Sequence, residues 1–96
     1  MVVKVKLIGV LTRLAGKSEV CLKATRSMAV SEAIGKICKK IAIPEFEQAI
    51  IDSNSKTVGP HIIVLVNDRD TSVLQGLRTR IRSNDTITLI PVAHGG

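Results

Sequence analysis

Residues 30–41 read VSEAIGKICKKI, a stretch whose apolar residues recur at steps of three and four. This spacing places them on one side of an α-helix and puts the lysines and Glu32 on its other faces. We therefore predict an amphipathic helix over 30–41. Pro44 is closely followed by two glutamates, which is typical of a helix start. We expect a short second helix from Pro44 to about Asp52, and then a loop over 53–60.

The segment before this helix carries the pattern of a β-hairpin. Apolar and polar residues alternate over residues 2–9 and again from Glu19 to Ala24. Such alternation is typical of strands with one face on a core and the other in water. A turn at Gly16-Lys17 would join the two strands.

Two more strands are predicted after the helices. Residues 62–66 read IIVLV, a continuous apolar run of strand length, and residues 86–90 alternate threonine with aliphatic residues. Asn67-Asp68 and Asn84-Asp85 are turn sequences, and Pro91, which lacks a backbone N–H, is expected to end the last strand. A helix between two pairs of strands predicts a two-layer α+β domain, in which the helix packs across a mixed sheet.

The composition is that of one small globular domain. The chain has 96 residues, 45% of them hydrophobic and 23% charged, which suffices for one core and is too little for two domains. Its longest apolar runs fall far below the roughly 20 residues that cross a bilayer. Lys4 and Lys6 interrupt the apolar residues at the start of the chain, which therefore does not look like a secretory signal. We therefore expect a cytoplasmic protein with no membrane partner.

The net charge is +6, and residues 1–43 dominate it with nine basic and two acidic residues. Such a field attracts either nucleic acid or an acidic protein. Phe46 is the only aromatic residue, so the chain lacks a platform on which bases could stack, and direct specific nucleic-acid binding is not expected. We interpret Lys4, Lys6 and Lys23 as a solvated face, as steering charges for an acidic partner, or as acceptor sites for self-conjugation.

The sequence shows none of the usual catalytic motifs. It has no phosphate loop, no metal-ligand cluster and no nucleophile at a recognised spacing from a base. We therefore do not expect an enzyme or a bound metal or cofactor. His61 and His94 are interpreted as solvated polar residues. Cys21 and Cys38 lack metal-binding and CxxC spacing, and they are interpreted as small buried thiols rather than a disulfide.

The most unusual feature is the ending His94-Gly95-Gly96. Two terminal glycines occur by chance in only about one chain in 200 at background glycine usage. A terminal carboxylate is ionised at neutral pH. It can attack the α-phosphate of ATP to give an acyl adenylate, which a thiol, amine or sulfide then displaces. Residues without a Cβ fit through a slot too narrow for side chains. The other interpretation is a frayed end without a role.

The order of elements and this ending resemble the ubiquitin-like β-grasp sulfur carriers. That group holds the molybdopterin synthase small subunit, the thiamine sulfur carrier and the ubiquitin-related modifier. The resemblance to the modifier is strongest over residues 59–96 and rests on Gly59-Pro60, residues 62–68, Asp70, Leu74, Asn84-Asp85 and His94-Gly95-Gly96. Pro91-Val92-Ala93 is instead similar to the end of the molybdopterin synthase subunit. Residues 1–43 match only as a pattern.

The resemblance implies a ubiquitin-like β-grasp domain over residues 1–91, with a mixed sheet packed on one main helix. A flexible reactive tail would follow over residues 92–96 and consist of Val92, Ala93, His94, Gly95 and Gly96. It also implies that an E1-like activating enzyme, using ATP and Mg, adenylates Gly96. The terminus would then become a thiocarboxylate and donate sulfur to tRNA through a sulfurtransferase or thiolation enzyme. Alternatively, it would form an isopeptide bond with lysines of target proteins.

The strand over residues 62–66 must turn one alternate set of side chains away from the helix. We predict an aliphatic patch on that side of the sheet, formed by Ile8, Ile62, Val64, Val66 and Ile90. An exposed apolar patch on a small protein usually marks a partner site. The alternatives are that the short helix or a second copy of the chain covers this face.

Two other functions stay open. A molybdopterin synthase small subunit would insert the same tail into a larger catalytic subunit. A small basic nucleic-acid-binding domain has only the net charge in its favour.

Overall fold

The computed structural model describes residues 1–92 of the chain. The elements follow one another as β1 Val2–Leu7, α1 Val10–Ala15, β2 Glu19–Lys23, β3 Met28–Ala29, α2 Val30–Ile41, α3 Pro44–Ile50, β4 Ile62–Val66, β5 Arg69–Asp70, β6 Arg80–Ile81 and β7 Thr86–Pro91. Two single 3-10 turns, Thr71–Val73 and Gly76–Arg78, lie between β5 and β6. The predicted main helix and the start of the short helix at Pro44 are confirmed.

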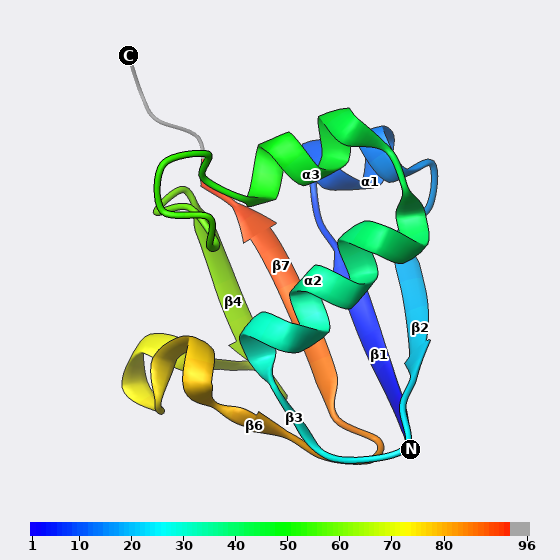
Figure 1. The fold of residues 1–96 in the computed structure, drawn as a ribbon, viewed down its shortest axis with the longest axis vertical. Helices are drawn as coiled ribbons and strands as arrows, with labels where there is room; N and C mark the ends of the chain where they lie inside the picture. Colours follow the sequence, from blue (N-terminus) through cyan, green and yellow to red (C-terminus); the bar gives the residue numbers. More distant parts are fainter. Residues whose placement is uncertain (93–96) are drawn as a thin grey trace.

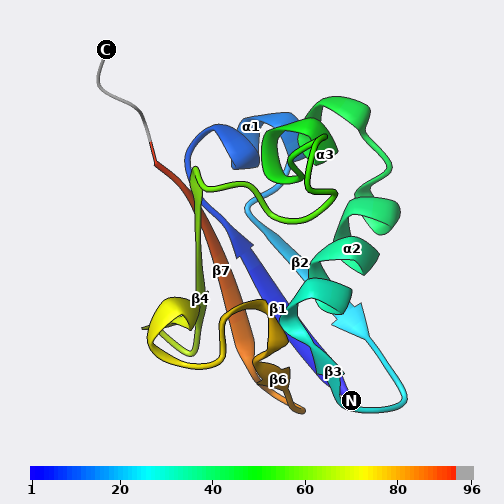
Figure 2. The same ribbon diagram turned by 60° about the vertical axis from the view of Figure 1, so that its left-hand side comes forward.

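Five strands form one mixed sheet in the order β2-β1-β7-β4-β5. The middle of the sheet is the parallel pair of β1 and β7, which places Leu7 beside Leu89 although these residues come from opposite ends of the chain. The other neighbouring strands are antiparallel. Figures 1 and 2 show α2 and α3 on one face of this sheet. The two-layer α+β fold is therefore confirmed.

The core lies between the helices and the sheet face that they cover. Alternate strand residues point into it, so that Val5, Leu7 and Leu89 are at most 2% exposed. The apolar stripe of α2 covers them, and α3 adds the fully buried ring of Phe46. In β1 the intervening residues Lys4 and Lys6 are exposed, as predicted for the solvated face.

Helix α1 is absent from the sequence prediction, which extends the first strand to residue 9. The strand ends at Leu7 because Gly9 adopts φ +60° and ψ −132°, a conformation that residues with a Cβ rarely adopt. Leu11 and Ala15 lie four residues apart and are both buried. Tertiary packing of this kind holds a helix too short to be stable alone.

Pro91 ends the last strand as predicted, but not by removing a hydrogen bond from the sheet. It is the final residue of β7, opposite Ile62, and the next residue, Val92, still donates its N–H to the His61 carbonyl oxygen at 2.7 Å. Backbone N–H groups alternate in direction along a strand. Because the Val92 N–H faces β4, the nitrogen of Pro91 faces the other way, beyond the end of β1. The missing N–H therefore removes no bond from the sheet.

Two of the turns that carry the family resemblance are linked to each other. Asn67 Nδ2 donates to Asp85 Oδ1 at 2.8 Å, and Asn67 Oδ1 accepts the N–H of Thr86 at 2.9 Å. Asp85 Oδ2 accepts the N–H of Arg82 at 2.7 Å. These contacts join the turn after β4 to the turn before β7, so the two Asn-Asp pairs have a structural role.

Replacing Asp85 with alanine should lower the free energy of unfolding by about 1–2 kcal/mol, because it leaves the Asn67 amide and the Arg82 N–H without their acceptor. Urea denaturation followed by circular dichroism measures the loss. The exposed Ser83 lies in the same turn, and Ser83→Ala is the matched control, expected to change stability by less than about 0.5 kcal/mol. Equal effects of the two substitutions would contradict this role of Asp85.

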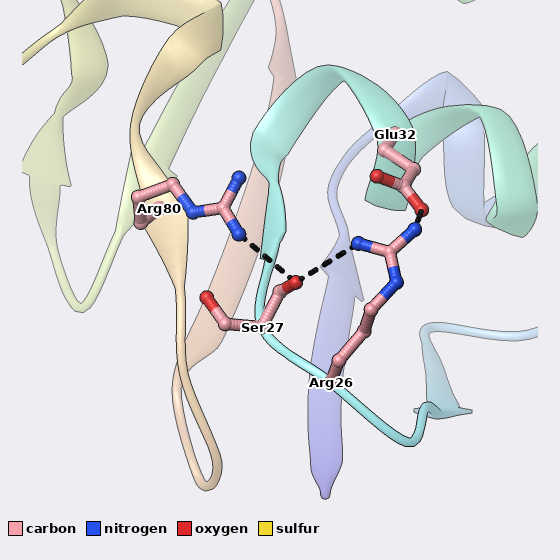
Figure 3. Close-up of polar contacts among 4 residues, drawn as sticks. All are labelled: Arg26, Ser27, Glu32 and Arg80. Carbon is pink, nitrogen blue, oxygen red and sulfur yellow. Dashed lines mark hydrogen bonds and ion pairs between the residues drawn. The ribbon is translucent and has the colours of Figure 1, made fainter.

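β3 and β6 form a separate antiparallel pair, in which Met28 lies opposite Ile81. A further set of polar contacts connects this pair to the start of α2 (Figure 3). The Ser27 carbonyl oxygen accepts bonds from Arg80 Nη2 at 3.0 Å and from Arg26 Nη1 at 3.3 Å. Arg26 also pairs with Glu32 at 3.2 Å. Ion pairs this exposed contribute at most about 1 kcal/mol, so their main effect is to orient the segment that leads into α2.

Candidate functional site

Of the predicted reactive tail, residues 92–96, the structure describes Val92 alone. Ala93, His94, Gly95 and Gly96 lie outside the described residues. Val92 is 42% exposed and extends β7 by its bond to His61, and Figure 1 shows this end of β7 at one end of the sheet. Pro91 Cγ would lie 3.4 Å from a Cβ placed on Gly9. We call Pro91 and Val92 the tail root, which is held by β4 on one side and by the turn after β1 on the other.

Four aliphatic side chains lie next to the tail root on the sheet face that α2 and α3 leave uncovered. They are Ile8, Ile63, Leu65 and Ile90, which we call the outer patch. Ile63 is directly opposite Ile90 in the β4–β7 register. The N–H of Ile8 donates to the Leu89 carbonyl oxygen at 3.2 Å, which brings Ile8 beside Ile90. Ile8 is 43% exposed, and the other three side chains are half-buried.

The predicted patch contained three residues of β4 that face the other way. Val64 and Val66 are only 4% and 6% exposed and belong to the core, so their predicted exposure is wrong. Ile62 shares their side of the strand and packs partly against the core. The continuous apolar run allowed either alternate set to face inward, and a shift of one residue reverses every side chain. Ile8 and Ile90 do lie on the outer face.

The short helix does not cover the outer patch. Phe46 and Ile50 anchor α3 in the core on the opposite face of the sheet. Along β1, the outward residues change from Lys4 and Lys6 to Ile8 as the strand approaches the tail root. Lys4 pairs with Glu19 across the hairpin at 3.8 Å. The outer face is therefore basic at one end and apolar at the end from which the tail leaves.

Among the titratable groups of the described chain, Asp52 has a lowered pKa and Cys38 a raised pKa. Residues 1–92 contain no group of three His, Cys, Asp or Glu side chains that could hold a metal ion. His61 is exposed. The pKa of the Asp52 carboxyl is lowered by hydrogen bonds from Ser55, within the loop after α3. No helix among these residues is both long and apolar enough to span a bilayer.

The two cysteines differ from each other. Cys38 is buried as predicted, whereas Cys21 is exposed on the outer face of β2, because it falls on the polar side of the strand's alternation. Both thiols are free. Burial, with a smaller effect of the Glu47 charge, raises the pKa of the Cys38 thiol from 9.0 to about 11.

The raised pKa of Cys38 predicts a pH dependence of stability. The unfolded thiol loses its proton near pH 9.0 and the folded one near pH 11, so deprotonation favours the unfolded chain between these values. The stabilising contribution is complete below pH 9 and is lost as the pH rises to about 11. Urea denaturation at pH 8, 9, 10 and 11 should show a steeper fall for the parent chain than for Cys38→Ala, and parallel curves would contradict the assignment. Cys21→Ala is the matched control, and its curve should follow the parent.

The geometry above defines a class of protein. A mixed sheet with a parallel central pair and one main helix across it is the arrangement of the ubiquitin-like β-grasp class. The chain superposes on SAMP1 from Haloferax volcanii with a TM-score of 0.85 at 23% identity, over all of both chains. It matches small archaeal modifier protein 1 from Methanosarcina acetivorans with the same TM-score at 26% identity, over 99% of this chain and 96% of that one.

Sequence comparison narrows the class to one family. The family model Urm1 (Ubiquitin related modifier) matches residues 2–96. Ubiquitin-related modifier 1 of Schizosaccharomyces pombe is 32% identical over 98 residues that span all of both chains. The homolog of Drosophila willistoni is 50% identical over 40 residues, which cover 42% of this chain and 40% of that protein. The chain belongs to the ubiquitin related modifier family and is a ubiquitin-like modifier.

Sequence reasoning missed two features of the site. Ile63 and Leu65 belong to the outer patch, and only the register of the sheet reveals this. Gly9 lies beside the tail root, where a Cβ would come into contact with the ring of Pro91. The sequence offered one signal for Gly9, which is a glycine directly after a strand pattern, a common mark of a turn that needs a positive φ.

Proposed function

We propose that the Gly96 carboxylate of this chain is activated by an E1-like enzyme and then used in two ways. The carboxylate attacks the α-phosphate of ATP, held with Mg by the enzyme, and pyrophosphate leaves. Hydrosulfide displaces AMP from the acyl adenylate, so that a C–S bond forms as the bond to AMP breaks, and a thiocarboxylate results. The thiocarboxylate serves as a sulfur donor for tRNA thiolation. A lysine amine of a target protein that displaces AMP instead gives an isopeptide bond.

The observation that carries this proposal is the family match, which runs through residue 96 and so includes the two glycines. The chemistry supports it, because an activated acyl group needs a terminus that a partner's active site can surround closely. The placement of the outer patch beside the tail root supplies a surface by which a partner could hold the domain during activation.

Intact-mass spectrometry of the chain isolated from its native cells tests the sulfur-carrier step. Replacement of one terminal oxygen by sulfur adds about 16 Da, and treatment with an alkylating reagent should modify this species at its end. Tryptic digestion of cell extracts should in parallel give lysines that carry residues 83–96 of this chain, because Arg82 is its last tryptic cleavage site. Absence of both products from growing cells would overturn the proposal.

A molybdopterin synthase small subunit is the second candidate, because Pro91-Val92-Ala93 is similar to the end of that subunit. The two functions differ in their partner. Stable co-purification with one larger subunit that binds a pterin precursor would favour the synthase. Lysine conjugates on many unrelated proteins would favour the modifier.

Replacing Ile90 with aspartate should raise the KM of the activating enzyme for the chain by about tenfold, since a charge in the centre of the outer patch would remain poorly solvated in the complex. Adenylate formation is measured by ATP–pyrophosphate exchange with the purified activating enzyme. Val73 is 75% exposed and lies outside the outer patch, so Val73→Asp is the matched control. If both variants behave like the parent, the outer patch is not the docking surface.

A further inference from the structure

Strand β2 leaves a row of backbone groups open at the edge of the sheet. It is the terminal strand of the order β2-β1-β7-β4-β5, and its one strand neighbour is β1. Figure 1 shows it at the border of the sheet. At the opposite edge, β5 covers part of β4, because it pairs with Leu65 and Val66. Within the described chain, β2 therefore offers an edge without any strand to cover it.

The register identifies the open groups. Met1 and Ala24 exchange both of their backbone hydrogen bonds, and Leu7 donates to Ser18 at 2.8 Å. In an antiparallel pair such bonded positions alternate, so Val20 and Leu22 face β1. The N–H and C=O groups of the residues between them point outward. These residues are Glu19, Cys21 and Lys23.

Within residues 1–92, one of these outward backbone groups is hydrogen-bonded to a side chain. The Cys21 carbonyl oxygen accepts a hydrogen bond from Lys40 Nζ of α2. Lys36 lies one helical turn before Lys40 and is on the same side of α2. An exposed lysine side chain can exchange a carbonyl partner for water or for a carboxylate at little cost. Lys40 therefore does not prevent an added strand from reaching the outward backbone groups of β2.

The surroundings of the edge are basic on both sides. Lys36 and Lys40 border it on the helix side, and Lys23 and Lys4 lie on the outer face of the sheet. The single carboxylate on β2, Glu19, is paired with Lys4. The side chains of an added strand would point alternately to these two sides. Acidic residues at either the odd or the even positions of that strand would therefore meet a lysine.

We infer that the β2 edge binds an extended acidic segment of a partner protein by β-strand addition. Main-chain hydrogen bonds to Glu19, Cys21 and Lys23 would supply the affinity, and the lysines would select acidic sequences. This surface lies on a different strand from the tail root, so a partner could hold it while the tail is engaged elsewhere. The competing explanation is that the lysines only keep the edge from pairing with other chains.

Nuclear magnetic resonance of the full chain tests the inference. The probe is a capped seven-residue peptide of alternating valine and aspartate, and the matched control peptide has lysine in place of aspartate. We expect the acidic peptide to slow hydrogen exchange at the amides of Glu19, Cys21 and Lys23, while the amides of Val20 and Leu22, which already bond to β1, change little. Shifts at lysine side chains without protection of the three outward amides would overturn the inference.

Two variants separate strand addition from simple charge attraction. Cys21→Pro removes the central outward N–H without touching a bond to β1, and it should weaken peptide binding at least tenfold relative to Cys21→Ala. Equal binding by these two variants would contradict strand addition. The double variant Lys36→Glu, Lys40→Glu changes only exposed side chains and should also weaken binding at least tenfold. Unchanged binding would overturn the inference even if Cys21→Pro does not fold.

Discussion

Deleting Gly96 should reduce adenylation of the chain by roughly a hundredfold or more, because the shortened terminus falls short of the attacking position by the length of a residue, about 3.5 Å, and an error of about 1 Å alone can cost that factor. The folded body should be unaffected, since the last strand of the sheet, β7, ends five residues earlier at Pro91. ATP–pyrophosphate exchange with the activating enzyme measures the rate, and thermal unfolding measures the stability.

The matched control for this deletion is His94→Ala, which changes the tail without altering its length or its two glycines. We expect it to be activated within a few-fold of the parent. A third variant, with two bulky residues added after Gly96 and resistant to trimming, should be inactive. If the deleted or extended chains were activated as fast as the parent, the terminal carboxylate would not be the reacting group.

Replacing Phe46 with alanine should lower the free energy of unfolding by about 3–5 kcal/mol, the usual cost of removing a fully buried ring. Phe46 is 0% exposed and anchors α3, which packs against both α1 and α2. For a domain of this size the midpoint of thermal unfolding should fall by at least about 12 °C. Scanning calorimetry measures this directly.

The control variants for Phe46 separate volume from aromaticity. Phe46→Leu keeps most of the apolar volume and should cost about 1–2 kcal/mol. Gln48→Ala alters an exposed residue of the same helix and should cost less than about 0.5 kcal/mol. A loss for Phe46→Ala no larger than that for Gln48→Ala would show that α3 does not depend on this side chain.

Several main elements of the fold could be predicted because they have a clear hydrophobic period. Residues 30–41 repeat at helical spacing, and residues 2–7 alternate as a strand, so local pattern and tertiary packing agree. Helix α1 could not be predicted in this way. It has six residues, two of them buried, and its start depends on the backbone conformation of Gly9 rather than on a capping side chain.

The candidate site was only partly predictable for a related reason. The glycine ending is visible in the sequence, whereas the outer patch depends on which side of β4 faces the helix. A strand of five consecutive apolar residues contains no alternation that shows which side chains face the core. Only its pairing with β7 shows that Ile63 faces outward and Val64 faces inward. The sequence also could not show that Pro91 removes no hydrogen bond from the sheet, because the direction of its nitrogen depends on that pairing.

The parallel pairing of β1 with β7 has a consequence for the synthesis of the protein. β1 is synthesised first on the ribosome, and it cannot form this pairing until β7 has been synthesised, because Leu7 pairs with Leu89 in the middle of the sheet. Such a distant contact requires a large loop to close before it contributes any stability. A chain interrupted before residue 86 would lack the strand that connects the two halves of the sheet. Incomplete translation products would thus stay unfolded and be open to proteolysis, instead of competing with finished molecules for the same enzymes.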